Sequence, residues 1–298
     1  MKKRRNVFRI AYTYYRTIRE VRLSRSKAGT VGILLFLLII STMMFFPFYL
    51  TVIQSFKPIE EFFYWPPRFY VINPTGRNYS IVFRVIDNWM VPMTRFMFNS
   101  IFTAVAGTAM AVVLSCLAAY PLAKGKIPGM KFLTAVVIGT LLFSNNSMDF
   151  FRYIILSGLR MVDTYWALII PWISGTMYVF LIRQFIIGTM QDEIIEASRI
   201  DGASEYTILF KIVMPMIKPA ILTMIVYAFP TIWTAVGTGV YTENLRTLPS
   251  VIGQIAMGGT AFSGPASAAG VMIMVPSLVI FIYSQRSIMA TMAYSGIK

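Results

Sequence analysis

At 298 residues the chain could form one or two soluble domains, but its composition excludes an ordinary soluble protein: 57% of the residues are hydrophobic, 13% are charged and the mean hydropathy is +0.66. The net charge of +15 does not indicate nucleic-acid binding, because the basic residues gather beside apolar segments. Since there is no histidine and only one cysteine, Cys116, an intramolecular disulfide and a thiolate metal cluster are excluded.

Six apolar segments are each long enough to cross a bilayer as a helix. A membrane-spanning helix needs about 20 predominantly apolar residues, since the hydrocarbon core is about 30 Å thick. The polar residues Asn145, Asn146 and Asp149 shorten the apolar run between the third and fourth segments. The predicted fold is therefore all-α, with a basic N-terminal segment, 1–28, and a six-span domain, 29–298. The predicted spans are 29–54, 97–122, 132–150, 164–188, 217–240 and 264–285.

The distribution of Lys and Arg predicts how these spans are oriented. Ten of them lie in residues 1–27, and Lys124, Lys126 and Lys131 fill the short link after the second span, which contains no acidic residue. With the N-terminus inside, 19 of the 27 lie on the inner side, and the other eight are interspersed with acidic residues. Short cytoplasmic loops carry such an excess. We therefore expect both termini in the cytoplasm.

The outer loop between the first two spans, 55–96, is rich in proline and aromatic residues, and we expect it to be ordered. Trp65, Phe69, Tyr70 and Tyr79 have apolar area to bury against the outer ends of helices. For any one of these four residues, a place in an interfacial aromatic belt is an equally good interpretation.

The most polar sustained passage of the second half lies in the predicted cytoplasmic loop 189–216, between the fourth and fifth spans. Its first part suits a short amphipathic helix, and a second helical run begins at Ser204. Asp201 is predicted to cap the second helix, and Glu205 lies in its first turn, where the helix dipole favours an anion. Gly202 permits a backbone conformation that a side chain would resist.

The spacing of the residues in this loop is specific. Eight positions over 20 residues follow the pattern E-A-A-x-x-D-G-A, then F-x-I-x-L-P, in the stretches Glu196-Ala197-Ser198, Asp201-Gly202-Ala203 and Phe210-x-Ile212-x-Met214-Pro215. This arrangement resembles the cytoplasmic loop of the permease subunits of importer-type ATP-binding-cassette (ABC) transporters, which also precedes the fifth span. Ser198 in place of the second Ala and Met214 in place of Leu are mild departures.

The resemblance implies that this loop carries a coupling helix, which seats in a groove of an ATPase subunit. Glu196 is expected to be the anchor, paired with an Arg of the ATPase. The alternative is that Glu196 pairs with Arg199 within the loop or caps a helix. The ATPase-coupling residues implied by the resemblance are Glu196, Ala197, Ser198, Asp201, Gly202, Ala203, Ile212 and Pro215.

Further stretches are similar to the carbohydrate-uptake branch of this family, the maltose-permease-like subunits and their lipoprotein-associated relatives. They are Asn99-Ser100, residues 118–124, residues 166–171 and the ending Gly-Ile-Lys. Residues 144–153 lack the Gly-Gly and Ile-Pro-x-Tyr sequences often found there in those relatives. That departure leaves the substrate open, so an amino-acid or peptide permease of the same class is the alternative.

The resemblance implies a non-catalytic subunit that carries a sugar, expected to be an oligosaccharide, across a bacterial-type plasma (inner) membrane. Its implied partners are a second, different permease subunit, two ATPase subunits and an extracellular solute-binding protein; no nucleic acid is expected. No cofactor or metal is expected in this chain, because ATP and Mg would be used by the partner ATPase. The chain itself has no G-x-x-x-x-G-K-[ST] sequence.

Aromatic and amide side chains are candidates for the sugar path, because sugars stack on aromatic rings and form hydrogen bonds with amides. For each aromatic candidate, helix packing or interface anchoring is the alternative. An ion-coupled secondary transporter is the rival class, and it is disfavoured because charged residues are nearly absent from the middle of the predicted spans. The candidates for the path are Asn145, Trp172, Tyr178, Tyr227 and Trp233.

Overall fold

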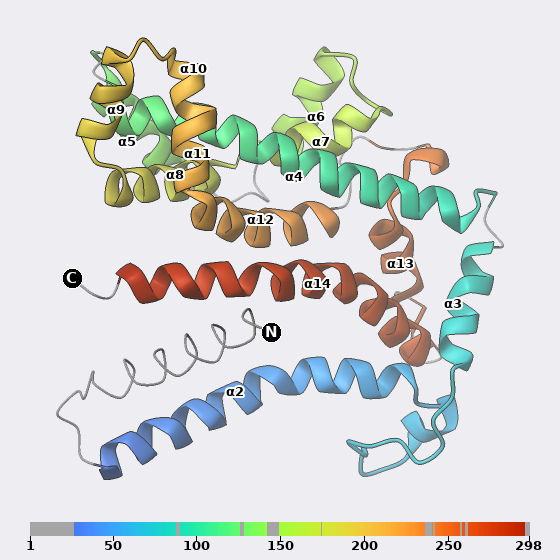
Figure 1. Ribbon diagram of the computed structural model, residues 1–298. Coiled ribbons are helices and arrows are strands. Elements are labelled where there is room, and N and C mark those ends of the chain that lie inside the picture. The colour runs from blue at the N-terminus through green and yellow to red at the C-terminus, as the bar shows by residue number, and fades with distance from the viewer. Residues whose placement is uncertain are drawn as a thin grey trace, which may run out of the picture. The chain divides into compact units, whose positions relative to one another are not determined.

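The computed structural model describes residues 27–87, 90–125, 128–141, 149–173, 175–235, 240, 242–256, 258–259 and 262–295. Within these ranges every regular element is a helix, so the all-α prediction is confirmed (Figure 1). The basic N-terminal segment predicted over 1–28 lies almost entirely outside the described residues. The chain divides into two compact units, Met1–Leu50 and Thr51–Lys298.

The first half of the chain contains α2 (Lys27–Ser55), the 3-10 turn η1 (Ile59–Phe63), α3 (Arg77–Asp87), α4 (Met93–Lys124), α5 (Met130–Thr140), α6 (Asp149–Gly158) and α7 (Tyr165–Ile173). The second half contains α8 (Thr176–Thr189), α9 (Asp192–Ile200), α10 (Glu205–Thr207), the π-helical segment η3 (Ile208–Val213), α11 (Met214–Met216), α12 (Lys218–Trp233), the 3-10 turn η4 (Glu243–Leu245), α13 (Leu248–Ala256) and α14 (Ser263–Ser295).

Among the described residues, three helices are long and apolar enough to cross a bilayer: Ala28–Ser55, Met93–Lys124 and Ser263–Gln285. They correspond to the first, second and sixth predicted spans. The fourth and fifth correspond to helix pairs with bends of 44° (α7 and α8) and 80° (Glu205–Met216 and α12), so five spans are reached if each pair is one span. The third predicted span, 132–150, overlaps part of α5 and the first two residues of α6, and 142–148 between them lie outside the described residues.

Helix α4 is the element against which most of the second unit packs. It contacts α7, α8 and α12, and α12 in turn contacts α14. In Figure 1, α9 and α10 lie at one end of α4, and α3 and α13 lie at its other end. The buried face of α4 has a polar or small residue at every fourth position, which allows neighbouring helices to approach closely. These residues are Asn99, Thr103, Gly107, Ala111, Ser115 and Ala119.

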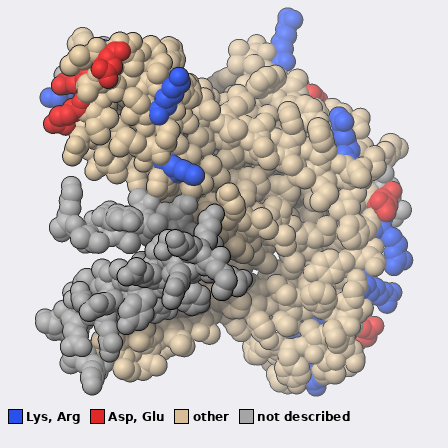
Figure 2. Space-filling model, viewed as in Figure 1, with Lys and Arg blue, Asp and Glu red and all other residues tan. Residues whose placement is uncertain are grey.

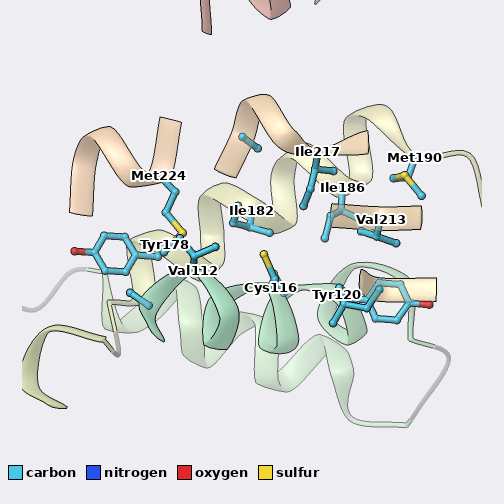
Figure 3. Close-up of a cluster of buried hydrophobic side chains, with 14 of the residues drawn as sticks. Val112, Cys116, Tyr120, Tyr178, Ile182, Ile186, Met190, Val213, Ile217 and Met224 are labelled. Carbon is cyan, nitrogen blue, oxygen red and sulfur yellow. The ribbon is translucent and has the colours of Figure 1, made fainter. Parts of the chain in front are cut away.

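Three clusters of buried apolar side chains follow α4 along its length. At its first end, Phe96 packs with residues of α3, α13 and α14. In the middle, Ala104 packs with Phe229 and Trp233 of α12. At its last end, Cys116 packs with residues of α8, η3 and α12 (Figure 3). The burial of these apolar surfaces is what joins the helices that follow α4 to it.

The segment between α2 and α4, which was predicted to be an outer loop, is ordered in its described residues, but most of their aromatic side chains are not buried. The buried carboxylate of Glu61 accepts hydrogen bonds from the backbone N–H groups of Ile72 and Asn73, at 3.2 and 2.9 Å. Of the four aromatic residues considered, Trp65, Phe69 and Tyr70 are exposed, and Tyr79 is half-buried with its hydroxyl 2.9 Å from Ser55 Oγ. For the first three, burial against helix ends was therefore the wrong interpretation, and hydrogen bonds between the Glu61 carboxylate and the backbone hold part of this segment instead.

We predict that a side chain at Gly107 separates α4 from its neighbours. A Cβ atom there would lie 3.2 Å from Ile232 Cγ2, which is closer than ordinary packing allows. Gly107→Val should lower stability by about 1–3 kcal/mol, the usual cost of overpacking. The measurement is thermal unfolding of the purified protein in detergent. Gly139→Val is the matched control, because a Cβ there meets no atom within 4 Å; equal unfolding temperatures for the two variants would contradict the packing described for α4.

Candidate functional site

The passage that the sequence singled out forms a short helix, a tight turn and a second helix. Ile195 is the buried residue of α9, and the last turn is closed by three backbone bonds of 3.0 Å, from the N–H groups of Asp201, Gly202 and Ala203. Gly202 has φ of +79°, the left-handed conformation that glycine adopts at the end of a helix. The requirement for glycine at this position is therefore a property of the backbone.

The cap of the second helix differs from the prediction. Ser204, not Asp201, is the N-cap residue of α10, and its hydroxyl accepts a hydrogen bond from the Thr207 N–H at 3.3 Å. Asp201 instead follows the last residue of α9, because the Gly202 turn places it four residues before the start of α10 at Glu205. Glu205 lies in the first turn of α10, as predicted.

Glu205 joins three helices. Its Oε2 accepts a hydrogen bond of 2.7 Å from the hydroxyl of Tyr120 in α4, and its Oε1 accepts one of 2.7 Å from Nε of Arg199 in α9. The bond from Arg199, and then that from Tyr120, lower the pKa of Glu205. In the same way, the bond to Glu205 raises the pKa of Arg199. The carboxylate is thus held ionised between the two donors.

A second set of polar bonds joins the C-terminal end of α4 to α8 and α9. Lys124 Nζ donates to the Met190 carbonyl at 2.7 Å and forms an ion pair with Asp192. Arg183 Nε of α8 donates to the Leu122 carbonyl at 3.1 Å. Carbonyl groups at a helix C-terminus lack partners within the helix, so basic side chains are well suited to them. We refer to the assembly of the α4 end, α9 and α10 as the α9–α10 corner.

Apolar packing under this corner attaches it to the spans. Ile182 and Ile186 of α8 meet Val213 of η3 and Ile217 around Cys116, as Figure 3 shows. Each of the five is at most 1% exposed. Since the cluster includes residues before and after the 80° bend at Ile217, the corner and the start of α12 share one core.

The chain turns sharply where the corner meets α12. Of the two predicted coupling residues in this part, Ile212 is half-buried in η3 and packs against the cluster, and Pro215 is exposed in α11. Pro219 lies in the first turn of α12, where its missing N–H costs nothing. Wide π-helical turns often occur at functional sites.

The outward surface of the corner combines charge with exposed apolar groups. Glu196, Ala197, Asp201 and Gly202 are exposed, and Figure 2 shows acidic and basic side chains together at this end of the molecule. A cavity of about 220 Å³ lies between α4 and α9, lined by Ala123, Lys124, Gly125, Asp192, Ile195, Glu196 and Arg199.

Two apolar residues of this surface were not among the predicted coupling residues. Ile200 is 86% exposed and Tyr206 is 71% exposed, on either side of the Gly202 turn. A large apolar side chain on an otherwise polar loop was the signal that could have found them. Ser198 and Ala203, by contrast, are half-buried, and Ser198 Oγ donates to the Ile194 carbonyl at 2.7 Å.

Comparison with known proteins gives one consistent result. No model of a protein family matches the chain. It is 27% identical over 238 residues to the polygalacturonan/rhamnogalacturonan transport system permease protein YtcP of Bacillus subtilis, covering 79% of this chain and 80% of that protein. It is 28% identical to the sulfoquinovosyl glycerol transport system permease protein SmoH of Agrobacterium fabrum, covering 85% and 88%.

The fold agrees. A chain of a bacterial ABC transporter involved in the import of the acidic polysaccharide alginate superposes with a TM-score of 0.71 at 19% identity, covering 88% of this chain and 98% of that one. A chain from the alginate transporter in complex with an alginate pentasaccharide-bound periplasmic protein gives a TM-score of 0.52 at 14% identity, covering 87% and 94%. The chain is similar, over most of its length, to permease proteins of ABC transporters and of sugar transport systems.

The candidate path residues do not form one group. The ring of Tyr178, which is buried, meets that of Tyr227 edge to face, with centroids 6.1 Å apart, and Tyr227 is 55% exposed. Trp233 is buried, stacks on Phe229 and donates its indole N–H to the Ile273 carbonyl at 2.9 Å.

The other two candidates are not part of this pair. Trp172 is half-buried, with the guanidinium of Arg152 5.3 Å from its ring centroid. Asn145 lies outside the described residues. Tyr178 and Tyr227 are thus the pair that the structure brings together, while the indole N–H of Trp233 already has a partner in the protein.

We predict that Tyr120→Phe loosens the α9–α10 corner without unfolding the chain. The variant removes one donor from Glu205, and a bond to a charged group contributes about 1.5–3 kcal/mol. Hydrogen exchange of the backbone amides of residues 205–208 should therefore become faster. Tyr206→Phe is the matched control, because its ring is exposed. Exchange that is as slow in Tyr120→Phe as in the control would contradict the role given to Glu205.

The same bonds give this protection a defined pH dependence. Because the pKa of Glu205 is lowered in the folded protein, its contribution is fully present above the ordinary glutamate pKa of about 4.3 and is lost only as the pH falls below it. After correction for intrinsic rates, exchange in residues 205–208 should show constant protection between pH 7 and about 5. Protection that fell within this range would show that another group controls the corner.

Proposed function

We propose that this chain is the membrane-spanning permease subunit of an ATP-driven importer that moves a sugar, in particular an oligosaccharide, into the cytoplasm. The α9–α10 corner is the observation that carries the proposal. It is a rigid projection with a glycine turn, exposed small residues and two exposed large apolar side chains, fastened to a membrane span by Glu205 and Lys124. Such a projection can transmit the movement of a docked protein to the helices behind it.

The partner that this surface suits is an ATPase subunit. Ile200 and Tyr206 offer apolar area to a groove, and the small residues Ala197 and Gly202 allow close approach. Glu196 offers a carboxylate at the rim of the 220 Å³ cavity, next to Arg199. The complete importer would contain two ATPase subunits, which use ATP and Mg, and a second permease subunit.

The sugar cargo is supported by the relatives, whose names specify polygalacturonan or rhamnogalacturonan and sulfoquinovosyl glycerol. A binding-protein partner is supported by the alginate transporter that was solved with its periplasmic protein. Within this chain, Tyr227 is the best candidate for contact with sugar, because its ring is exposed and is supported by Tyr178. An amino-acid or peptide cargo has no corresponding support among these relatives.

We predict that Gly202→Val and Glu196→Lys abolish uptake while leaving the permease inserted in the membrane. A β-branched residue in the left-handed conformation costs about 1–2 kcal/mol and adds bulk to the docking surface; a lysine at 196 reverses the charge. The measurements are co-purification of the ATPase and ATP-dependent sugar uptake by proteoliposomes. Gly139→Val is the control, because it adds the same side chain on a helix far along the chain. Full ATPase association and uptake in both variants would refute the coupling role.

The orientation of the chain follows from the same proposal, with the corner and both termini in the cytoplasm. Tyr70 and Ser204 are both exposed, so each can be replaced with Cys in a Cys116→Ala background. A membrane-impermeant maleimide added to intact cells should label Cys at 70 and leave Cys at 204 unlabelled until the membrane is opened. Labelling of position 204 from outside would contradict this topology.

A further inference from the structure

A second polar cluster lies at the opposite end of α4 from the α9–α10 corner. Asn99 is completely buried, and its Nδ2 donates to the carbonyls of Asn244 and Arg246, at 2.8 and 3.0 Å. Its Oδ1 accepts a hydrogen bond of 2.8 Å from the hydroxyl of Tyr165 in α7. One amide therefore joins α4, α7 and the segment 242–248, which leads into α13.

Other bonds hold the same segment along its length. Ser100 Oγ accepts from the Leu248 N–H at 2.7 Å, and Asp163 Oδ1 accepts from the Thr242 N–H at 2.9 Å. Within the segment, Arg246 pairs with Glu243 at 3.0 Å. Backbone carbonyls need donors, and Asn99 supplies one to two of them at once. The Asn244 carbonyl also accepts a hydrogen bond of 3.3 Å from Nε of Arg95. We call residues 242–248 the fastened segment.

The distance of this cluster from the α9–α10 corner suggests that the two lie on opposite sides of the membrane. Asn99 and Tyr120 are 21 residues apart on one helix, which corresponds to about 32 Å of rise, similar to the hydrocarbon core of about 30 Å. If the α9–α10 corner is cytoplasmic, the fastened segment lies at the outer surface, where a solute-binding protein must dock and release its cargo. This step rests on the function proposed above.

We propose that Asn99 is a positioning residue, which fixes the fastened segment on the outer end of α4 in the conformation that receives the solute-binding protein. Asparagine suits this role because its amide has two N–H donors for the two carbonyls and an oxygen for the tyrosine hydroxyl. An aspartate has almost the same shape but no donor, and it places a negative charge against both carbonyls. Asn99→Asp therefore releases the segment and leaves the helix otherwise intact.

The release can be measured without a partner protein. Thr247 is 4% exposed, and its hydroxyl finds no hydrogen-bond partner within the described part of the chain, so Thr247→Cys removes no bond. In a Cys116→Ala background, a small maleimide reaches this thiol only when the segment lifts. Asn99→Asp should speed labelling by about tenfold, because the loss of the two half-buried hydrogen bonds from Asn99 Nδ2 shifts the opening equilibrium by about that factor.

The control is Thr103→Val, a buried, nearly isosteric change one turn further along α4. The Thr103 hydroxyl bonds only to the carbonyls of Asn99 and Ser100 in its own helix, so labelling should keep the unsubstituted rate. Tyr165→Phe, which removes only the bond to Asn99 Oδ1, should give an intermediate rate. If Asn99→Asp were labelled at the same rate as the chain that keeps Asn99, then Asn99 would not hold the fastened segment in place.

The functional part is tested in the assembled importer. In Asn99→Asp, ATPase activity without binding protein should be unchanged, and the binding-protein concentration for half-maximal stimulation should rise about tenfold, because part of the docking free energy is used to reseat the segment. Faster labelling with unchanged half-saturation would overturn the docking role. If the proposed function itself is wrong, the unsubstituted chain shows no stimulated ATPase activity, whereas the labelling experiment still reports on Asn99.

Discussion

The structure of the second unit depends on the close packing of α4 with its neighbours. Gly107 and the small residues spaced four apart from it allow α7, α8 and α12 to approach the helix, since a methyl group at Gly107 would already press on Ile232. In a bilayer such packing, together with buried hydrogen bonds, is what holds helices together, because lipid tails are as apolar as the side chains they would replace. A helix that is packed along its whole length is also a stiff one.

Polar bonds attach a separate part of the chain to each end of this stiff helix. At one end Tyr120 and Lys124 bind the α9–α10 corner, and at the other Asn99 and Ser100 bind the fastened segment. Several of these side chains form hydrogen bonds with backbone groups of loops, which would otherwise lack hydrogen-bond partners. The result is one helix to which the surface proposed for the ATPase and the surface proposed for the binding protein are both attached.

The sequence was sufficient to predict the helical class, most of the spans and the two helices around Gly202. It succeeded there because apolar length, charge placement and a glycine at a left-handed turn are local properties. Two details of the predicted loop differ: Ser204 rather than Asp201 caps α10, and Ile200 and Tyr206 add apolar groups to its surface. The position of a cap shifts by one or two residues with the end of the preceding turn. Composition does not determine where that turn ends.

The contacts that join distant parts of the chain could not be predicted from the sequence. Asn99 and Tyr120 were visible as parts of a family pattern, but their partners, 145 and 85 residues away, depend on how segment 242–248 and α10 fold back on α4. The same holds for Trp233, which sequence reasoning placed near the sugar path and which donates its indole N–H to Ile273. The exposed Trp65 shows the reverse case, since its side chain, expected to pack against helix ends, is 89% exposed.

The central claim is that α4 carries both of its polar ends as one body during transport. Spin labels on exposed positions can test it in the assembled importer, with one pair at Leu114 and Ile200 and a second pair at Ile101 and Asn244. Both separations should be the same in the nucleotide-free state and in a trapped ATP-bound state of a complex that is active in uptake. A change of several ångströms in either separation would show that the corner or the fastened segment moves independently of α4, and would contradict this account.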